Sequence, residues 1–339
     1  MLTKTLGTPM EEKKVTVVIT PRDRYTLVIE CIESLYALTP EPFDLKVLDL
    51  GYPKTIKKQL EQLLASKNNA EIYDYGRIIP MEAIRKVRDC ITTPYTMFLD
   101  NDSNVTEGWL MPLIIAAETE HAAIVNPLTL EKEGVDKGAA LRSHLYTNEI
   151  RMVEIEGTDY LLEEKHLRRA LPEDIPTDVV PSEMFELHGV LFDTQVLKTI
   201  ELPQMVIREH IDIAIQVRKM GRKIITQPKS IIVFDNLGTR MHLCDMEYFF
   251  FRWGYKLTSK SSRLFEQRWG YNFYAEQAMY HWVFRRRIFL YCRWLHLPIS
   301  VANNATRVFA KIKTMINPVW DPLKDPYENS RNFFQHNKV

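Results

Sequence analysis

Short apolar runs alternate with segments of helical periodicity along the first hundred residues of the chain. The β-branched run at residues 15–19 ends at Thr20-Pro21, which predicts a buried parallel strand. Over residues 25–38 the apolar side chains recur at helical spacing, which predicts a helix. The same two patterns continue in chain order, with strands at 43–50, 71–75 and 96–99 and helices at 55–66 and 81–91.

Beyond residue 105 the pattern is less regular until a further helix and strand appear. We expect residues 105–200 to form irregular strands and loops. A helix is predicted at 208–220, where Gly221 occupies the position that commonly ends a helix, and a strand follows it. Alternating strands and helices are typical of a parallel sheet covered on both faces. Such sheets bind ligands outside the carboxyl ends of their strands.

The last third of the chain has a different character. Segments such as MEYFFFRWGYKL and MYHWVFRRRIFLYCRWLHL are dense in aromatic and basic residues and predict amphipathic helices. Between Arg240 and Lys313 there are 13 Lys or Arg against 4 Asp or Glu. Three interpretations remain open: helices that pack on the sheet, helices that dock on an anionic membrane, or helices whose Trp253, Trp269 or Trp282 stacks on an acceptor sugar.

The overall composition narrows the class of protein. Lys plus Arg equals Asp plus Glu at 44 each, so no global field favours nucleic acid as a partner. The four cysteines are far apart with no CxxC pair, which indicates neither a zinc knuckle nor a disulfide framework. The first 15 residues lack the apolar core of a signal peptide, and no apolar run reaches the roughly 18 residues of a spanning helix. We therefore expect a soluble, cytoplasmic protein.

Residues 95–104, YTMFLDNDSN, carry the main candidate chemistry. A strand that is expected to be buried ends in Asp100 and Asp102, with no basic residue beside them. Two carboxylates in such a place repel each other and are costly to desolvate unless a cation joins them. Mg²⁺ and Mn²⁺ prefer oxygen ligands and commonly take one or two carboxylates plus substrate phosphates. A polar loop cap remains the simpler interpretation of Asp100 and Asp102, and their place after an apolar strand in an α/β pattern strengthens the interpretation as a metal site.

A second acidic pair begins the later helix. Glu209 and Asp212 are three residues apart, so they share a face near the helix N-terminus, which stabilises their ionised forms. Either carboxylate is a candidate general base toward an acceptor hydroxyl, and His210 between them is a third. Acidic residues are also common in first turns for structural reasons alone.

Four further residues are weaker candidates. Asp49 ends the second strand, where it is either a nucleobase or ribose contact or only a turn residue. Arg85 and Arg88 lie on the helix before the Asp100 strand, where they face either a diphosphate or solvent. His242 follows the last expected strand and is a candidate third ligand of the metal, although a lone histidine is more often structural.

The order of these segments resembles that of the family 2 glycosyltransferases, which have the GT-A fold. The residues that carry the resemblance lie at 15–24, 47–53, 84–110, 185–197 and 209–224. The resemblance implies an α/β fold with a Rossmann-like, mostly parallel central sheet flanked by helices and a C-terminal helical extension. It divides the chain into a GT-A catalytic domain at 1–236 (nucleotide-binding half about 13–104, acceptor half about 105–236), a basic, aromatic-rich helical extension at 237–316 and a loose tail at 317–339.

The resemblance also implies a nucleotide-sugar donor, with Mn²⁺ or Mg²⁺ held by Asp100 and Asp102. Thr20, Pro21 and Asp49 match positions that contact the nucleotide in this family.

Two family elements depart from the usual pattern. Glu209-His210 matches the Glu-Asp element that carries the base, with histidine where aspartate is usual, so Glu209, Asp212 and His210 all stay open. Arg88 matches the arginine of an Arg-Asn pair, and Arg85 is the alternative match. The RWG triplet at 268–270 resembles a Lys-Trp-Gly element that some members carry after the catalytic domain.

Together these features predict an inverting glycosyltransferase that moves a sugar, with a UDP-sugar favoured, to a hydroxyl of a glycan or lipid-linked glycan. A sugar-1-phosphate nucleotidyltransferase remains an alternative, although TPRDRY lacks the glycine-rich loop of that class. A degenerate domain that binds a nucleotide or glycan without turnover is a third, favoured by His210. Peripheral membrane contact through residues 240–313 would place the protein at the inner face of a membrane.

Overall fold

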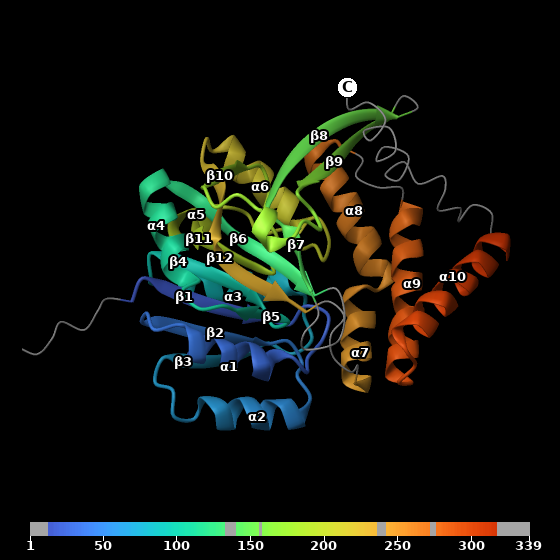
Figure 1. The fold of residues 1–339 in the computed structure, drawn as a ribbon, viewed down its shortest axis with the longest axis horizontal. Helices are drawn as coiled ribbons and strands as arrows, with labels where there is room; N and C mark the ends of the chain where they lie inside the picture. Colours follow the sequence, from blue (N-terminus) through green and yellow to red (C-terminus); the bar gives the residue numbers. More distant parts are fainter. Residues whose placement is uncertain (1–12, 133–139, 156–157, 236–241, 272–275, 317–339) are drawn as a thin grey trace, which may run out of the picture.

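The computed structural model describes residues 13–132, 140–155, 158–235, 242–271 and 276–316. They form a mixed α/β structure in which a 10-stranded sheet is flanked by helices, with further helices gathered beyond one end of its strands (Figure 1). The expected tail at 317–339 and the first 12 residues lie outside the described residues.

The amino-terminal half of the sheet is parallel, as the sequence predicts. Its strands lie in the order β3-β2-β1-β4, and the first of them in the chain is buried at every position. Continuous burial suits a parallel strand, because helices cover both of its faces. The elements of this half are β1 Val15–Thr20, α1 Val28–Leu38, β2 Phe43–Asp49, α2 Lys54–Leu64, β3 Ala70–Asp74, α3 Pro80–Val87, the 3-10 turn Arg88–Cys90 and β4 Tyr95–Asp100.

The second half of the sheet is mixed, so the expectation of a mostly parallel sheet holds only for the first half. β11 lies antiparallel between β4 and β6, and β12 then runs parallel to β6. A strand that is buried on both faces has the same apolar pattern in either direction, so the sequence does not reveal this reversal. The strands of this half are β5 Ser103–Val105, β6 Ala122–Lys132, β7 Leu141–Leu145, β10 Val180–Ser182, β11 Gly189–Asp193 and β12 Lys223–Phe234.

Residues 105–200 are more regular than predicted. Helix α4, Leu110–Glu120, has apolar residues on most sides, and this hides the helical period. A separate hairpin, β8 Thr147–Ile155 and β9 Thr158–His166, extends from the sheet (Figure 1). The remaining elements are the 3-10 turn Pro172–Asp174 and helices α5 Thr194–Thr199 and α6 Glu209–Lys219.

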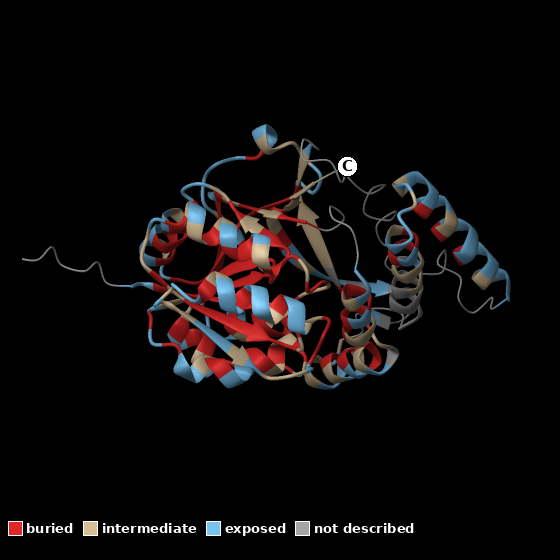
Figure 2. Ribbon diagram, turned by 90° about the horizontal axis from the view of Figure 1, so that it is seen from below, coloured by how far each residue is buried: buried red, intermediate tan, exposed pale blue. Residues whose placement is uncertain are grey.

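The basic, aromatic region is helical, as predicted, and much of it packs on the α/β core. It contains α7 Leu243–Arg252, α8 Tyr255–Trp269, α9 Glu276–Trp294 and α10 Ile299–Ile316. Tyr248 and Phe265 belong to the main hydrophobic core, whereas Phe249 and Phe289 form a second cluster with Val206. Figure 2 shows the buried residues concentrated in the sheet and the inward helix faces. Among the described residues no helix combines the length and apolarity needed to cross a bilayer.

Candidate functional site

The carboxyl end of β4 carries a buried pair of carboxylates, which we call the carboxylate corner: Asp100 and Asp102. Each is only 4% exposed, and Asn101 between them is fully buried. The Asn101 amide accepts a hydrogen bond from the Arg22 backbone N–H at 3.0 Å and donates one to the Arg24 carbonyl at 2.5 Å. Asn101 therefore joins the loop after β1 to the end of β4 by two hydrogen bonds.

That loop supplies cations that the sequence analysis did not assign to the corner. Arg22 Nη1 lies 2.9 Å from Asp100 Oδ2, and Arg24 Nη2 lies 3.2 Å from Asp235 Oδ1. Burial opposes the charge on Arg22, but the carboxylates of Asp100 and Asp23 raise the pKa of its guanidinium above the ordinary value. The alternating charges of Arg22-Asp23-Arg24 are the feature of the sequence that could have indicated these cations. Local sequence does not show, however, that this segment folds onto Asp100, which lies 78 residues further along the chain.

Asp102 remains short of positive charge even with these arginines nearby. Its Oδ1 atom is buried and has no hydrogen-bond partner. Burial and the neighbouring Asp100 raise the pKa of Asp102 to about 8, although Arg24 and Arg22 act in the opposite direction. A buried, unpaired carboxylate oxygen beside a second carboxylate fits the place of a divalent cation.

A histidine from the next strand adds a nitrogen to this corner. One ligand atom from each of Asp100, Asp102 and His188 lies within 4.8 Å of the other two. His188 Nδ1 is 3.4 Å from Asp100 Oδ2, yet it is buried and makes no hydrogen bond. Burial and the Arg22 charge lower the pKa of His188, which favours its neutral form.

On its other side His188 begins a series of carboxylate–imidazole contacts, which we call the imidazole chain: His188, Glu186, His144 and Glu131. Successive contacts measure 3.1 Å, 3.0 Å and 3.2 Å. Lys165 also forms an ion pair with Glu186. Burial opposes ionisation of Glu186, but Lys165 and His144 hold its pKa well below the usual value. Burial also disfavours a charge on His144, yet Glu186 and Glu131 raise its pKa.

The structure does not place His242 in this site. Among the described residues His242 joins no cluster of potential metal ligands, and it is exposed. It is the N-cap of α7, where its backbone N–H donates to the Asp245 carboxylate at 3.1 Å. The exposure of His242 and its place at the start of α7 argue against the predicted role as a metal ligand, which stays a prediction.

The three candidate bases have very different surroundings. Asp212 is fully buried and accepts hydrogen bonds from Arg268 Nε, Trp269 Nε1 and Gln216 Nε2, each at 2.7 Å. Its carboxylate therefore anchors α8 through the RWG triplet, and this argues against the role of base.

Glu209 is the candidate with an available carboxylate oxygen. It is 5% exposed, and its Oε2 atom has no hydrogen-bond partner. Its Oε1 atom lies 3.9 Å from Arg252 Nη2. Burial lowers the pKa of the adjacent His210 to about 4, which makes the imidazole a weak proton acceptor. Arg208, which precedes this pair, adopts the left-handed conformation at φ 68° and starts the helix.

Comparison with known proteins identifies the architecture. The model of glycosyl transferase family 2 matches residues 16–184, which include β1, β4 and the carboxylate corner. Residues 16–184 of the chain form a family 2 glycosyltransferase domain. The expected resemblance is confirmed, and no curated protein is a detectable sequence relative of this chain.

The solved structure of GalNAc-T7 has a similar fold. The crystal structure of GalNAc-T7 with UDP, GalNAc and Mn²⁺ superposes with a TM-score of 0.52 at 12% identity and covers 71% of this chain. This chain spans only 47% of GalNAc-T7. Weaker similarities are to the mannosyltransferase PcManGT from Pyrobaculum calidifontis with GDP-Man and Mn²⁺ (TM-score 0.49, 13% identity, 91% of this chain and 77% of that chain) and to S. aureus TarS 1–349 with UDP-GlcNAc (0.46, 11%, 88% and 92%).

The predicted nucleotide contacts Thr20, Pro21 and Asp49 lie at the carboxyl ends of the neighbouring strands β1 and β2. Thr20 is paired with Asp100 in the sheet, and the Pro21 carbonyl accepts a hydrogen bond from the Tyr248 hydroxyl at 3.0 Å. Asp49 is engaged within the protein, because Oδ1 caps the Gly51 and Tyr52 amides and Oδ2 lies 2.6 Å from Lys57 Nζ. Its role toward a nucleobase stays a prediction that would require Lys57 or this turn to move.

The two arginines predicted to face a diphosphate are not in the carboxylate corner. Arg88 donates to the Ile200 carbonyl at 2.8 Å. Asp193, just before α5, pairs with Tyr95, the first residue of β4, so Arg88 lies at the opposite end of β4 from Asp100. Arg85 is exposed on α3. The placement of Arg88 before the amino end of β4 argues against the predicted contact, which stays a prediction.

Helix α7 of the helical extension contacts the loop that borders the carboxylate corner. Arg252 of α7 is 3% exposed and lies 2.7 Å from Asp23 Oδ1, which also accepts from Trp253 Nε1 at 2.8 Å. Burial raises the pKa of Asp23, but Arg252, Arg22 and Arg286 together hold it below the ordinary value. Trp253, predicted as a possible sugar platform, is instead tied to this ion pair.

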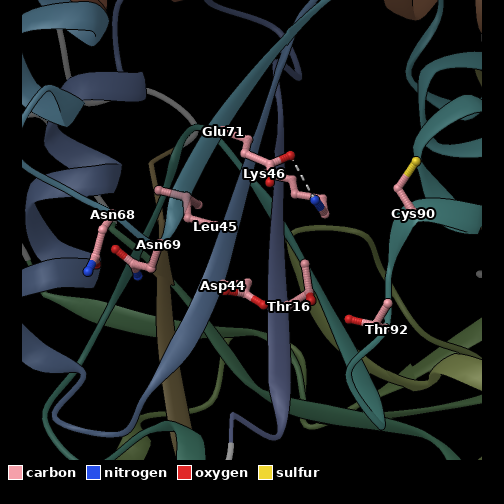
Figure 3. A pocket seen from close by; sticks show the side chains of 9 residues that line it. All are labelled: Thr16, Asp44, Leu45, Lys46, Asn68, Asn69, Glu71, Cys90 and Thr92. Atoms are coloured by element: carbon pink, nitrogen blue, oxygen red, sulfur yellow. Dashed lines mark hydrogen bonds and ion pairs between the residues drawn. The ribbon is translucent and has the colours of Figure 1, made fainter.

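A separate cavity of about 160 Å³ lies at the other end of the sheet (Figure 3). It is lined by residues near the amino ends of β1 and β2, including Thr16, Asp44 and Lys46, and Lys46 is paired with Glu71 across it. Ligands of open α/β sheets bind at the carboxyl ends of the strands, so we do not regard this cavity as the substrate site.

Proposed function

We propose that this protein transfers a sugar from a nucleotide-sugar donor to a hydroxyl of a glycan or lipid-linked glycan, using a divalent cation. The observation that carries the proposal is the carboxylate corner, in which the unpaired Asp102 oxygen lies beside Asp100 at the carboxyl end of a family 2 sheet. The structurally similar GalNAc-T7 was crystallised with UDP, GalNAc and Mn²⁺, which favours a nucleotide sugar and Mn²⁺ or Mg²⁺ here. We favour a UDP-sugar as donor.

The arginines around the corner suit a diphosphate. Arg22, Arg24 and Arg252 come from the loop after β1 and from α7, and all are paired with carboxylates at or near the corner. Arginine side chains bind phosphate oxygens through several N–H groups at once. Without a donor, the positive charges of these arginines are neutralised by their carboxylate partners. When a donor binds, its diphosphate would replace some of these carboxylates as the partner of the arginines.

Asp100 and Asp102 would hold the cation, whose positive charge would stabilise the nucleoside diphosphate as it leaves. Glu209 Oε2 has no protein hydrogen bond and would accept the proton of the acceptor hydroxyl. The acceptor oxygen then forms a bond to the anomeric carbon as the bond from that carbon to the diphosphate breaks. Attack from the face opposite the leaving diphosphate inverts the anomeric configuration.

The proposal predicts donor-specific stabilisation that depends on the metal. UDP-, GDP- and dTDP-sugars are to be compared by thermal shift with Mn²⁺ or with EDTA. A donor at 100 times its Kd adds about 2.7 kcal/mol to the free energy of unfolding, so one donor should raise the melting temperature with Mn²⁺ only. Donor hydrolysis or transfer in the same tubes distinguishes an enzyme from a degenerate binding domain, and release of pyrophosphate from a nucleoside triphosphate would favour a nucleotidyltransferase. No shift with any donor contradicts the proposal.

We further propose peripheral membrane contact through α10, in accord with the predicted contact region at 240–313. Small residues of α10 are buried, namely Ala302, Thr306 and Ala310, whereas its large apolar residues are exposed. The exposed set comprises Val301, Val308, Phe309, Ile312, Met315 and Ile316. Lys311 and Arg307 lie on the same helix, and an apolar face with flanking basic residues suits an anionic bilayer surface.

Liposome sedimentation tests this contact. The wild-type chain should co-sediment with vesicles of anionic lipid more than with neutral vesicles, and Ile312→Glu should return it to the supernatant because a carboxylate opposes burial at the interface. Ile115→Glu is the matched control, since Ile115 is 52% exposed on α4, outside the basic region. Equal recovery of wild type and Ile312→Glu with anionic vesicles would exclude the contact.

A further inference from the structure

We propose that His188 is the third protein ligand of the cation, binding through Nδ1, and that Glu186 is a positioning residue that fixes the ring for this purpose. The inference rests on the metal site of the proposed function and names a ligand that the sequence analysis did not select. It replaces His242, which the structure places outside the site.

The hydrogen bonds on the far side of the ring determine which nitrogen faces the carboxylate corner. Glu186 Oε2 lies 3.1 Å from His188 Nε2 and 3.0 Å from His144 Nε2. An ionised carboxylate accepts hydrogen bonds and cannot donate them, so His188 carries its proton on Nε2. A neutral imidazole has one N–H, and its Nδ1 therefore presents a lone pair toward Asp100.

This lone pair has no protein donor. His188 Nδ1 is 3.4 Å from Asp100 Oδ2, which is itself an acceptor, and the side chain is 2% exposed. Asp102 Oδ1 is a second buried acceptor without a partner in the same group. Buried polar atoms that lack a hydrogen-bond partner are unfavourable, and either a proton on Asp102 or a bound cation would relieve this corner. A cation bound by Asp100, Asp102 and His188 would satisfy the three residues together.

The ring is held in place from several directions before any ligand binds. The Asp100 backbone N–H donates to the His188 carbonyl at 3.3 Å, which joins the two strand ends directly. Phe234 packs against the ring with a centroid distance of 3.7 Å. A Cβ at the next residue, Gly189, would lie 2.3 Å from Ile232 Cδ1, so a larger residue there would require the Ile232 side chain to move.

Glu186 has the contacts of a residue that orients a metal ligand. Lys165 occupies its Oε1 atom, and two imidazole rings share its Oε2 atom. His144, Glu186 and His188 also bring one potential ligand atom each within 4.8 Å of one another, but both oxygens of Glu186 already have donors, which favours hydrogen bonding over a second metal site. Carboxylates that accept the other N–H of a ligating histidine fix its tautomer and orientation, and their loss commonly weakens metal affinity about 10- to 100-fold.

A nitrogen ligand also affects which cation binds. Carboxylate, carbonyl and water oxygens suit both Mg²⁺ and Mn²⁺, but Mn²⁺, as a first-row transition ion, accepts an imidazole nitrogen more readily than Mg²⁺ does. We therefore expect this chain to prefer Mn²⁺ to Mg²⁺, and to prefer it less when His188 is replaced by asparagine, which offers an amide oxygen.

Titration of the full chain with Mn²⁺ alone, followed by the electron paramagnetic resonance signal of the free ion, tests the inference. We expect His188→Ala and Glu186→Gln to weaken Mn²⁺ binding about 10- to 100-fold. His188→Asn should reduce the ratio of the Mg²⁺ Kd to the Mn²⁺ Kd. His242→Ala is the matched control and should bind Mn²⁺ as the wild type does. Circular dichroism and the melting temperature of each metal-free variant confirm that the variant is folded.

The outcomes separate this inference from the proposed function. If wild type binds Mn²⁺ and both His188 variants bind it equally well, His188 is not a ligand, while the Asp100 and Asp102 site stands. A loss of affinity in His242→Ala would overturn the assignment in favour of His242. Absence of Mn²⁺ binding by the wild type, with or without UDP, would contradict the metal site itself.

Discussion

Replacement of Asp102 by asparagine is expected to reduce sugar transfer on the order of 100- to 1000-fold, comparable to the loss of a group that stabilises transition-state charge. The side chain keeps its size but loses the charge that would bind the cation. Its Oδ1 atom accepts no hydrogen bond from the protein, so the substitution removes no internal hydrogen bond at this atom. Transfer rates at saturating Mn²⁺ and donor measure the effect.

The same variant should be at least as stable as the wild type when metal is removed. In the folded wild type, burial and Asp100 raise the pKa of Asp102 from 3.8 to about 8. The folded state therefore binds more protons than the unfolded state between these values, and the stability of the wild type falls as the pH rises through this range. Urea unfolding in EDTA should show a smaller fall for Asp102→Asn than for the wild type. An active variant, or one that unfolds at neutral pH, would contradict this account of the corner.

Replacement of Glu209 by glutamine is expected to reduce the transfer rate about 100- to 10,000-fold, the usual contribution of a general base. Glutamine is nearly the same shape, and the contact with Arg252 is long at 3.9 Å, so donor and Mn²⁺ binding should persist. The expected signature is a loss of kcat with little change in the donor Kd. An unchanged kcat would exclude Glu209 as the base.

Asp212→Asn is the comparison for Glu209→Gln. Asp212 lies on the same helix as Glu209, but its carboxylate stabilises the fold. Its carboxylate is fully buried and holds Arg268, Trp269 and Gln216. Arg268 keeps Glu201 as a second partner at 2.7 Å, but the loss of charge weakens the hydrogen bonds at residue 212, which we expect to lower the free energy of unfolding by roughly 1–3 kcal/mol. Urea unfolding measures this loss. A variant with wild-type stability and no transfer would instead assign the base to Asp212.

Glu209 and Asp212 show which properties of the site local sequence can predict and which it cannot. Spacing places both carboxylates on one face at the start of α6, and both predictions were reasonable on that ground. The difference lies in α8, whose RWG triplet reaches Asp212 from 56 residues further along the chain. Helical period describes which residues share a face, but it does not describe what packs against that face.

His188 and His242 differ for a similar reason. Both precede apolar segments, and His242 is the one that the sequence analysis selects as the candidate ligand. Antiparallel pairing of β11 with β4 brings His188 to the end where Asp100 lies, and this reversal of direction leaves no trace in the apolar pattern of the strand. Capping by Asp245 holds His242 at the surface end of α7.

The sequence by itself determined the α/β class, the parallel first half of the sheet and the carboxylates at the end of β4, because burial period and strand-end polarity are local properties. Only the tertiary structure decided that Arg22 pairs with Asp100, that α8 satisfies Asp212 and that His188 faces the corner. Each of these contacts joins elements that are distant in the chain. Their energies come from burial and charge pairing, which exist only once the strands and helices have packed.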